Sequence, residues 1–221
     1  MQRDYIQAYN EAISETDKAA ALMVVDQALS DGYSPEDIVF KLVIPAVEAM
    51  MVKIEQDRDS NLAQHFMTAQ IASEVTEKML ENFDQAPELI GRVVIGAAFG
   101  DLHSLGKRIV AGCLKAMMIG VIDLGINVRP EQFVEAAVAH DAQVIAISAM
   151  MVHTATGENG ALKVRALLKE RGLEHRIKLA VGGAPYRFDP ELYLNVGADT
   201  WAPDGVTAAK VIAQLIKEVK A

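Results

Sequence analysis

Apolar residues in the first part of the chain recur at spacings of three and four. Ala21, Val25 and Leu29 follow this spacing, as do the apolar positions of residues 38–50 and 62–80. Such spacing places apolar side chains on one face of a helix. Ser34 followed by Pro35 is typical of a helix start. We therefore predict an all-α domain at residues 1–85, built as a bundle of three or four helices.

Beyond residue 88 the pattern changes to short β-branched runs that alternate with helical segments. The predicted strands cover residues 92–97, 121–126, 144–148, 178–181 and 200–202, and the predicted helices cover residues 105–119, 130–140, 159–171 and 205–219. This alternation predicts an α/β domain at residues 88–221, with a flavodoxin-like, doubly wound, five-stranded parallel sheet. The polar segment 81–87 ends in proline and suits a connection between the two domains.

Composition narrows the classes of partner. The 221 residues are 51% hydrophobic and 23% charged, and no apolar run approaches the roughly 20 residues of a membrane helix. The net charge of −9 repels phosphate backbones and anionic lipid, so we expect neither nucleic acid nor membrane as a partner. A single cysteine, Cys113, and a start without a secretory pattern predict a cytoplasmic protein.

Three loops carry the residues whose side chains could bind a metal or another ligand. Residues 100–106 follow the first predicted strand, residues 148–154 include the end of the third, and Gly182 and Gly183 follow the fourth. In the strand order 2-1-3-4-5 these strands are neighbours, and ligands bind at the carboxyl ends of the strands in such sheets. We expect the three loops to form one continuous surface.

The first loop contains a candidate metal ligand. The imidazole of His103 suits a transition metal, and Asp101 can bind the other ring nitrogen from two residues away. Thr154 can reach Asp101 from the neighbouring loop, and Gly106 permits close approach of backbone or ligand.

One histidine and one carboxylate cannot complete a closed zinc site. The metal is therefore expected to arrive inside a cofactor. Gly182 and Gly183 remove side-chain bulk where a flat or extended ligand could lie against the sheet.

Together these residues resemble the cobalamin-binding domain of methionine synthase and of the corrinoid methyl carriers of methanogens and acetogens. Asp101, His103 and Gly106 match the D-x-H-x-x-G pattern of that family. Ser148 and Met150 match its S-x-L element, and the glycine pair follows in order. The resemblance covers most of the chain, because the helical half resembles the cap over the methyl face of the cofactor.

The resemblance implies that the nucleotide base of cobalamin leaves cobalt and that His103 takes the lower axial position. Asp101 and Thr154 would form a proton relay behind the imidazole, and Ser148 would hydrogen-bond the buried base. The full set implied to contact the cofactor is Gly100, Asp101, Leu102, His103, Ser104, Leu105, Gly106, Ser148, Met150, Val152, Thr154, Gly182, Gly183, Trp201 and Gly205.

The sequence departs from the family pattern at several positions. Met150 replaces the usual leucine, Val152 stands where threonine is frequent, and Gly205 stands where alanine is common. Residues 59–64 are only a faint version of the turn that begins a cofactor-facing helix in the cap.

The function implied by the resemblance is methyl carriage. The chain would receive a methyl group from a methyl-donor methyltransferase, pass it to a methyl-acceptor methyltransferase, and depend on a reductive activator, without being catalytic alone. Methoxylated aromatics, methanol or methylamines would be the donors.

Three other classes stay open at this point. The small subunit of an adenosylcobalamin-dependent mutase shares the histidine loop. A cobalamin photoreceptor would need a DNA-binding helix-turn-helix and a basic face, neither of which is visible. A flavodoxin-like receiver or flavin protein would bind no corrinoid.

Overall fold

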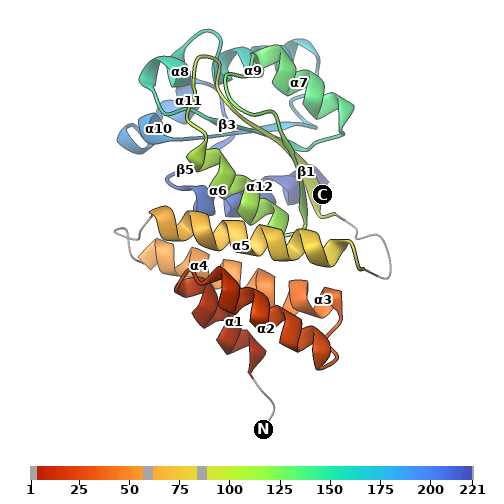
Figure 1. Cartoon of the computed structure of the whole chain (residues 1–221). Helices are drawn as coiled ribbons and strands as arrows, with labels where there is room; N and C mark the ends of the chain where they lie inside the picture. The colour runs from red at the N-terminus through yellow and green to blue at the C-terminus, as the bar shows by residue number, and fades with distance from the viewer. Residues whose placement is uncertain (1–3, 57–61, 84–88, 221) are drawn as a thin grey trace. The chain divides into compact units, whose positions relative to one another are not determined.

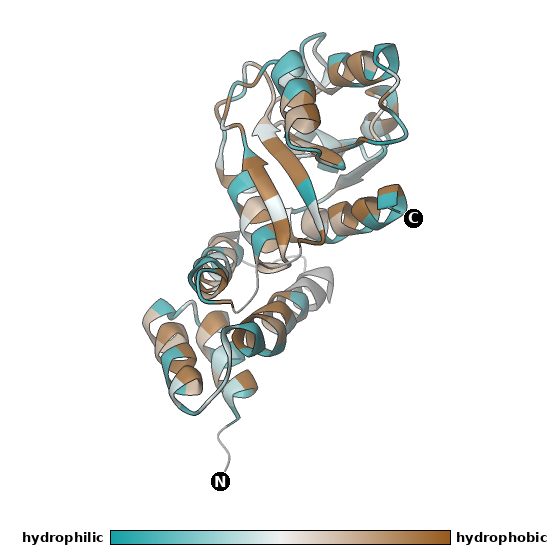
Figure 2. Ribbon diagram, turned by 90° about the vertical axis from the view of Figure 1, so that its right-hand side faces the viewer, coloured by the Kyte–Doolittle hydropathy of each residue, from teal (hydrophilic) through white to brown (hydrophobic). Residues whose placement is uncertain are grey.

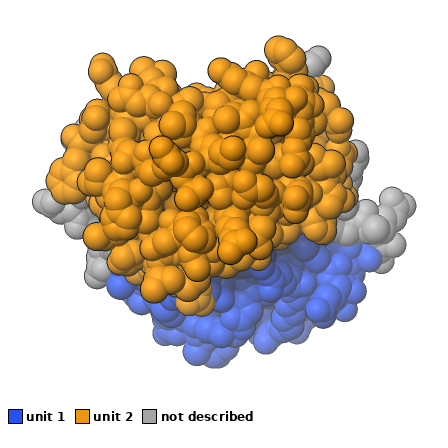
Figure 3. Space-filling view, turned by 90° about the horizontal axis from the view of Figure 1, so that it is seen from above, with its two compact units in different colours: residues 1–88, 115–117 blue, residues 89–114, 118–221 orange. Residues whose placement is uncertain are grey.

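The computed structural model describes residues 4–56, 62–83 and 89–220. The chain divides into two compact units, which Figure 3 shows in different colours. Unit 1 comprises Met1–Glu88 and Lys115–Met117, and unit 2 comprises Leu89–Leu114 and Met118–Ala221. The predicted connection at residues 81–87 lies in part outside the described residues, and so does half of the segment 59–64.

The first unit is helical, as its apolar spacing predicts (Figure 1). Its elements are α1 (Tyr5–Ser14), α2 (Lys18–Ser30), α3 (Pro35–Asp37), η1 (Ile38–Val43), α4 (Ile44–Gln56) and α5 (Leu62–Leu80). Ser34 begins α3 as expected, because its hydroxyl accepts a hydrogen bond from the Asp37 N–H at 3.1 Å. The π-helical segment η1 is absent from the prediction, since its apolar residues are compatible with either helix type.

The second unit is built on a five-stranded parallel sheet (Figure 1). Its strands are β1 (Gly91–Ala97), β2 (Ile119–Asp123), β3 (Val144–Ser148), β4 (Lys178–Gly182) and β5 (Thr200–Ala202). Their order is β2-β1-β3-β4-β5, which confirms the predicted flavodoxin-like topology. At the carboxyl edge Ala97 pairs with Ser148, Ser148 with Gly182, and Gly182 with Ala202.

Helices connect the strands in the manner of βαβ units. They are α6 (Leu105–Ala116), α7 (Pro130–Ala139), α8 (Val152–Thr156), α9 (Ala161–Glu170), α10 (Ala184–Phe188), α11 (Leu192–Asn195) and α12 (Gly205–Lys220). The short helices α8, α10 and α11 are absent from the prediction, because each is too short to show a helical period.

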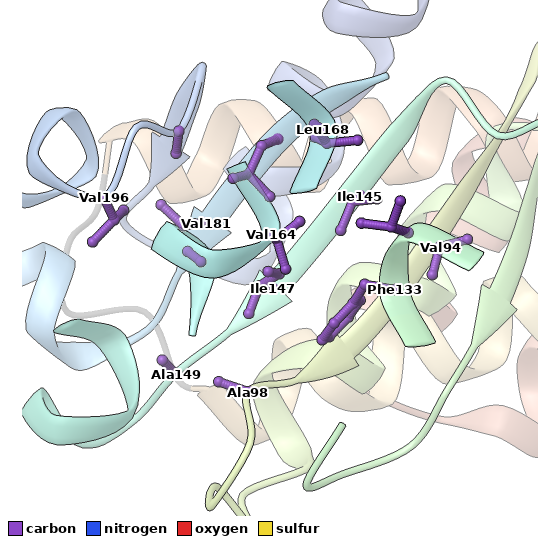
Figure 4. Close-up of a cluster of buried hydrophobic side chains, with 14 of the residues drawn as sticks. Val94, Ala98, Phe133, Ile145, Ile147, Ala149, Val164, Leu168, Val181 and Val196 are labelled. Carbon is purple, nitrogen blue, oxygen red and sulfur yellow. The ribbon is translucent and has the colours of Figure 1, made fainter. Parts of the chain in front are cut away.

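The sheet is apolar on both faces, and the strands in Figure 2 are correspondingly brown along most of their length. On one face, Val94, Ile145 and Val181 pack with Phe133 of α7 and Leu168 of α9 (Figure 4). Side chains alternate along a strand, so the neighbouring positions point to the other face. That face carries α12, and it also carries the Ser148 and Gly182 positions.

One predicted strand is displaced along the sequence. Residues 121–126 were expected to form the second strand, but β2 covers Ile119–Asp123. Ile119 already pairs with Gly91 as part of the strand. The preceding helix therefore ends at Ala116 and does not reach residue 119. At the far end, the Gly125 N–H donates to the Asp123 carboxylate at 2.8 Å and the chain turns there, although the residues beyond are still apolar.

Within the described residues, no helix combines the length and apolar character needed to cross a membrane.

Candidate functional site

The loop that follows β1 is bent so that its side chains lie at the carboxyl edge of the sheet. Gly100 has a φ of 80°, a conformation that favours glycine, and the Asp101 N–H closes a turn onto the Ala98 carbonyl at 2.9 Å. Ser104 precedes the first residue of α6, and its carbonyl accepts from the Arg108 N–H. Residues 101–104 thus connect β1 to α6, with Asp101 buried and with Leu102 and His103 exposed.

The Asp101 side chain is the centre of this site and is 1% exposed. One carboxylate oxygen accepts from the His103 N–H at 3.0 Å and lies 2.8 Å from His103 Nδ1. The other oxygen accepts from the Met150 N–H at 2.6 Å and from the Thr154 hydroxyl at 2.9 Å. A single carboxylate therefore joins the loops after β1 and β3, as the sequence predicted for His103 and Thr154.

These contacts keep Asp101 ionised. Burial alone raises the pKa of a carboxyl group, but the donors from His103, Met150 and Thr154 outweigh burial and lower the pKa of Asp101 to about 2. An ionised Asp101 can only accept hydrogen bonds. It therefore places the proton of a neutral His103 ring on Nδ1.

The His103 ring offers its second nitrogen outward. The side chain is 57% exposed although its partner Asp101 is buried. Because Nδ1 faces Asp101, Nε2 is the nitrogen available to a ligand. A buried carboxylate that orients an exposed imidazole is the arrangement expected behind a metal-binding histidine.

The Thr154 hydroxyl can form a hydrogen bond with Asp101 in either protonation state of the carboxyl group. Its oxygen lies 2.9 Å from the Asp101 carboxylate and 2.8 Å from the Met151 carbonyl. With Asp101 ionised, the hydroxyl can donate to the carboxylate. With Asp101 protonated, the hydroxyl can accept from it and donate to Met151 instead.

Two glycines leave space beside the sheet edge. A Cβ at Gly106 would meet nothing closer than Ser148 Oγ at 3.9 Å, and one at Gly182 would lie 3.6 Å from the Ala202 carbonyl. A Cβ at either position would not collide with the protein itself, so the fold does not require glycine there. Ser148 is half-buried at the same edge, and no hydrogen bond joins its hydroxyl to another part of the described chain. These residues form a cradle with one polar group, which fits an extended ligand with a polar tail.

Two other predicted glycines have reasons within the fold. Gly183 has a φ of 118°, and a Cβ there would lie 2.0 Å from the Ala149 carbonyl oxygen. A Cβ at Gly205 would meet Ile109 of α6 at 2.9 Å. Gly183 therefore allows β4 to pass the β3 loop, and Gly205 allows α12 to approach α6.

Trp201 is separated from the other predicted contacts. It pairs with Val181 and packs against the core cluster on the face of α7 and α9. Ser148 and Gly182 belong to the opposite face, because their positions alternate with that one along the strands. The structure thus brings together the first two loops and Gly182, and it directs the Trp201 side chain elsewhere.

Large apolar side chains are exposed in the loops around His103. Leu102 is 68% exposed and Val152 is 66% exposed, and the other members are Phe99, Leu105, Ile126, Met150 and Met151. Phe99, Ile126 and Met151 were not among the predicted site residues, although their places just after strands could have indicated them. Exposed apolar residues grouped around a polar centre are typical of a ligand-binding surface.

Among the described residues, no three His, Cys, Asp or Glu side chains are grouped so that they could hold a metal ion. His103 with its carboxylate, the cradle at Gly106 and Gly182, and the apolar surroundings fit a metal that brings its own planar ligand.

Comparison with known families identifies the class. The B12 binding domain family matches residues 91–212, which is more than half of the chain. The chain belongs to this family, and its cofactor is cobalamin or a related corrinoid.

Within that class the chain is similar to the corrinoid proteins of methyltransferase systems. Trimethylamine corrinoid protein 1 of Methanosarcina acetivorans is 32% identical over 209 residues, which cover 93% of this chain and 92% of that protein. The dimethylamine corrinoid protein of Methanosarcina barkeri is 30% identical over 219 residues, with 96% and 98% covered. These matches place the chain among the corrinoid methyl carriers.

The fold is also that of a solved structure. A chain of the methanol:cobalamin methyltransferase complex MtaBC from Methanosarcina barkeri superposes with a TM-score of 0.76 at 24% identity. The alignment covers 98% of this chain and 81% of that one, so both the helical part and the sheet have counterparts there.

Proposed function

We propose that this protein carries methyl groups on a corrinoid that it binds with the base displaced and with His103 as the axial ligand. The observation that carries the proposal is the placement of the two ring nitrogens of His103. Nδ1 lies 2.8 Å from the Asp101 carboxylate, and the side chain is 57% exposed, which leaves Nε2 available to cobalt. When bound, the corrinoid supplies the methyl-transfer chemistry, since its reduced cobalt is a nucleophile and its methylated cobalt an electrophile.

The chain's own residues would bind the cofactor and hold a proton. Gly106 and Gly182 leave room for the nucleotide tail, and the half-buried Ser148 offers its hydroxyl to the displaced base. Asp101 and Thr154 would form the relay behind the imidazole: when the ring is released from the metal, its Nε2 can take up a proton, and the ionised Asp101, to which Thr154 donates, would stabilise the charged ring through Nδ1.

The partners follow from the relatives. Proteins named for trimethylamine and dimethylamine are similar over nearly the whole chain, and a relative in fold is part of a complex with a methanol methyltransferase. We therefore expect a methyl-donor methyltransferase, a methyl-acceptor methyltransferase and a reductive activator. Methylamines are the favoured donors, because the similarity in sequence is to methylamine proteins. The same similarity favours a carrier over the small subunit of a mutase.

Ligation is tested by loading the protein with cobalamin and recording the electron paramagnetic resonance spectrum of the Co(II) form. Isotopic substitution separates the two candidate nitrogens. Protein labelled with ¹⁵N should show the ¹⁵N splitting pattern if His103 is the ligand, whereas His103→Ala should lose that splitting. A wild-type spectrum that is unaffected by labelling the protein would refute the assignment.

The carrier role is tested separately. Cobalt in the reduced, loaded protein should become methylated when a methylamine and its methyltransferase are added, and the visible spectrum reports this directly. Methylation by a methanol methyltransferase but by no methylamine enzyme would reassign the donor.

A further inference from the structure

The loop after β2 runs beside the histidine loop and is hydrogen-bonded to the end of β1. The Leu124 N–H donates to the Ile95 carbonyl at 2.8 Å. The Ala97 N–H donates to the Gly125 carbonyl at 3.0 Å, and the Ala97 carbonyl accepts from the Val128 N–H at 3.0 Å. A bridge between Ala98 and Val128 continues this pairing. The β2 loop therefore follows β1 to the point where the histidine loop begins.

Asn127 makes two hydrogen bonds to the residues that precede His103. Its side-chain oxygen accepts from the Gly100 N–H at 2.8 Å, and its own N–H donates to the Asp101 carbonyl at 3.0 Å. Asn127 has a φ of 55°, a conformation that asparagine tolerates better than most residues. Two segments 27 residues apart thus fix each other through the Gly100 N–H and the Asp101 carbonyl, which lie on either side of the peptide between these two residues.

This contact complements the one from the other neighbouring strand. The Asp101 carboxylate is bound by Met150 and Thr154 of the β3 loop, whereas the Asp101 carbonyl is bound by Asn127 of the β2 loop. The β3 side therefore holds the Asp101 side chain and the β2 side holds its backbone. Loss of either contact would let the carboxylate turn relative to the sheet, and His103 would turn with it.

The β2 loop is itself anchored at its start. The Asp123 carboxylate accepts from the Gly125 N–H at 2.8 Å and from the Lys107 ammonium at 2.6 and 2.7 Å. Lys107 lies in the first turn of α6, the helix that follows the histidine loop. The loop that bears Asn127 is consequently tied to both ends of the segment that carries His103.

We propose that Asn127 is a positioning residue that holds His103 in the orientation for axial ligation. The inference rests on the proposed function, because it assigns a role towards the same imidazole. Asn127 acts through Gly100 and Asp101 and makes no hydrogen bond to the His103 ring among the described contacts.

Three variants separate the side chain from the backbone. Asn127→Gly keeps the positive φ and the N–H to Asp101 but removes the acceptor for Gly100. Asn127→Asp keeps an acceptor at the same place. Asp141→Gly is the matched control, because Asp141 also has a positive φ, of 50°, but lies before β3, at the opposite edge of the sheet.

Ligation is measured on the cobalamin-loaded proteins at a pH where the wild type shows both histidine-bound and histidine-free cobalt. The ratio of histidine-free to histidine-bound cobalt should rise about fivefold or more in Asn127→Gly, the effect expected for one lost hydrogen bond. It should stay near the wild-type ratio in Asn127→Asp and Asp141→Gly. Hydrogen exchange of the Gly100 amide in the cofactor-free proteins should be fast only in Asn127→Gly.

The outcomes distinguish the two proposals. A wild type whose cobalt has no protein nitrogen would refute the proposed function and the role of Asn127 with it, while Gly100 exchange would still report on the contact. If the wild type binds through His103 but Asn127→Gly leaves the ratio unchanged, only the positioning role fails. An equal rise of this ratio in Asn127→Gly and in either Asn127→Asp or Asp141→Gly would also overturn the positioning role.

Discussion

Asp101 accepts hydrogen bonds from three residues while it is almost fully buried, and this makes its charge state the most informative property of the site. Four donors satisfy its two oxygens. A neutral side chain of the same shape cannot accept all of them, so an amide there would leave buried donors poorly paired. The effect should be measurable in the cofactor-free protein.

We predict that Asp101→Asn destabilises the cofactor-free protein in a pH-dependent way. The pKa of Asp101 is lowered to about 2, below the value of 3.8 expected for the unfolded chain. The ionised group therefore stabilises the fold above about pH 4, and this contribution is lost as the pH falls towards 2. The difference in unfolding free energy between wild type and variant should shrink by roughly 2 kcal/mol over that interval.

Urea unfolding at a series of pH values measures this difference. Other carboxylates titrate equally in both proteins, so they cancel in the comparison. A difference that stays constant from pH 5 to pH 2 would show that the Asp101 contacts do not depend on its charge.

At the scale of the elements, the two adjacent glycines at the end of β4 have different reasons. Gly183 is required by the chain itself, because its φ is 118° and a Cβ would lie 2.0 Å from a backbone oxygen. Gly182 has only ordinary contacts around the position of a Cβ. The pair therefore offers a matched comparison between a folding role and a binding role.

We predict that Gly183→Ala costs about 3 kcal/mol of unfolding free energy or more, since it combines backbone strain with a collision. Gly182→Ala should leave stability within about 1 kcal/mol and weaken cobalamin binding about tenfold, because it fills the proposed cradle. Denaturant unfolding and equilibrium binding measure the two effects. A corrinoid that lacks the nucleotide tail should bind Gly182→Ala and wild type equally, and a loss there would argue against the cradle.

The ion pair between α6 and the end of β2 is a second test at this scale. The Lys107 side chain is 5% exposed and the Asp123 side chain 38% exposed. Removal of Asp123 leaves an ammonium buried without its partner, whereas removal of Lys107 leaves a carboxylate that water can reach. We predict that Asp123→Ala costs roughly 3 kcal/mol and that Lys107→Met costs about 1 kcal/mol.

The double variant Lys107→Met with Asp123→Ala decides the cause. It should be less stable than Lys107→Met by only about 1 kcal/mol, the hydrogen bond from Gly125, because the unpaired buried charge is gone. Additive losses would mean that the two side chains act independently.

The strand order and the histidine loop were predictable because both depend on local patterns. Alternating β-branched and helical segments define βαβ units, and Asp101 lies two residues from His103. The end of β2 was misplaced because Leu124 and Ile126 prolong the apolar run past the turn at Gly125. The pairing of Asn127 with Gly100 could not be foreseen, because it depends on two loop conformations with positive φ that no periodic pattern encodes.

The site prediction was limited in a similar way. The glycine pair was expected to act together, yet only the backbone geometry separates the role of Gly183 from that of Gly182. Trp201 was assigned to the cofactor from its place in the final stretch, but the register of β5 puts it opposite Val181 on the other face. Short strands give too few residues for the alternation to be seen in sequence.

For the whole molecule, a single buried thiol reports on the opening of the α/β unit. Cys113 lies in α6 and is fully buried, and burial together with the nearby charge of Asp204 raises the pKa of its thiol to about 12. Only the thiolate reacts with a thiol reagent. In the folded protein the reagent should therefore label Cys113 only when the unit opens.

We predict that cobalamin protects Cys113 from labelling in moderate urea. A ligand that binds only the folded state lowers the open fraction by a factor of 1 + [L]/Kd, which is about 100-fold at a concentration of 100 Kd. When opening and closing are faster than the reaction, the labelling rate falls by the same factor. Fully unfolded protein should react at the same rate with and without cobalamin, which controls for effects on the reagent. Protection that is equally strong with a corrinoid lacking the tail would place the binding energy in the corrin ring instead of the cradle at Gly106 and Gly182, because only a complete cobalamin can fill that space.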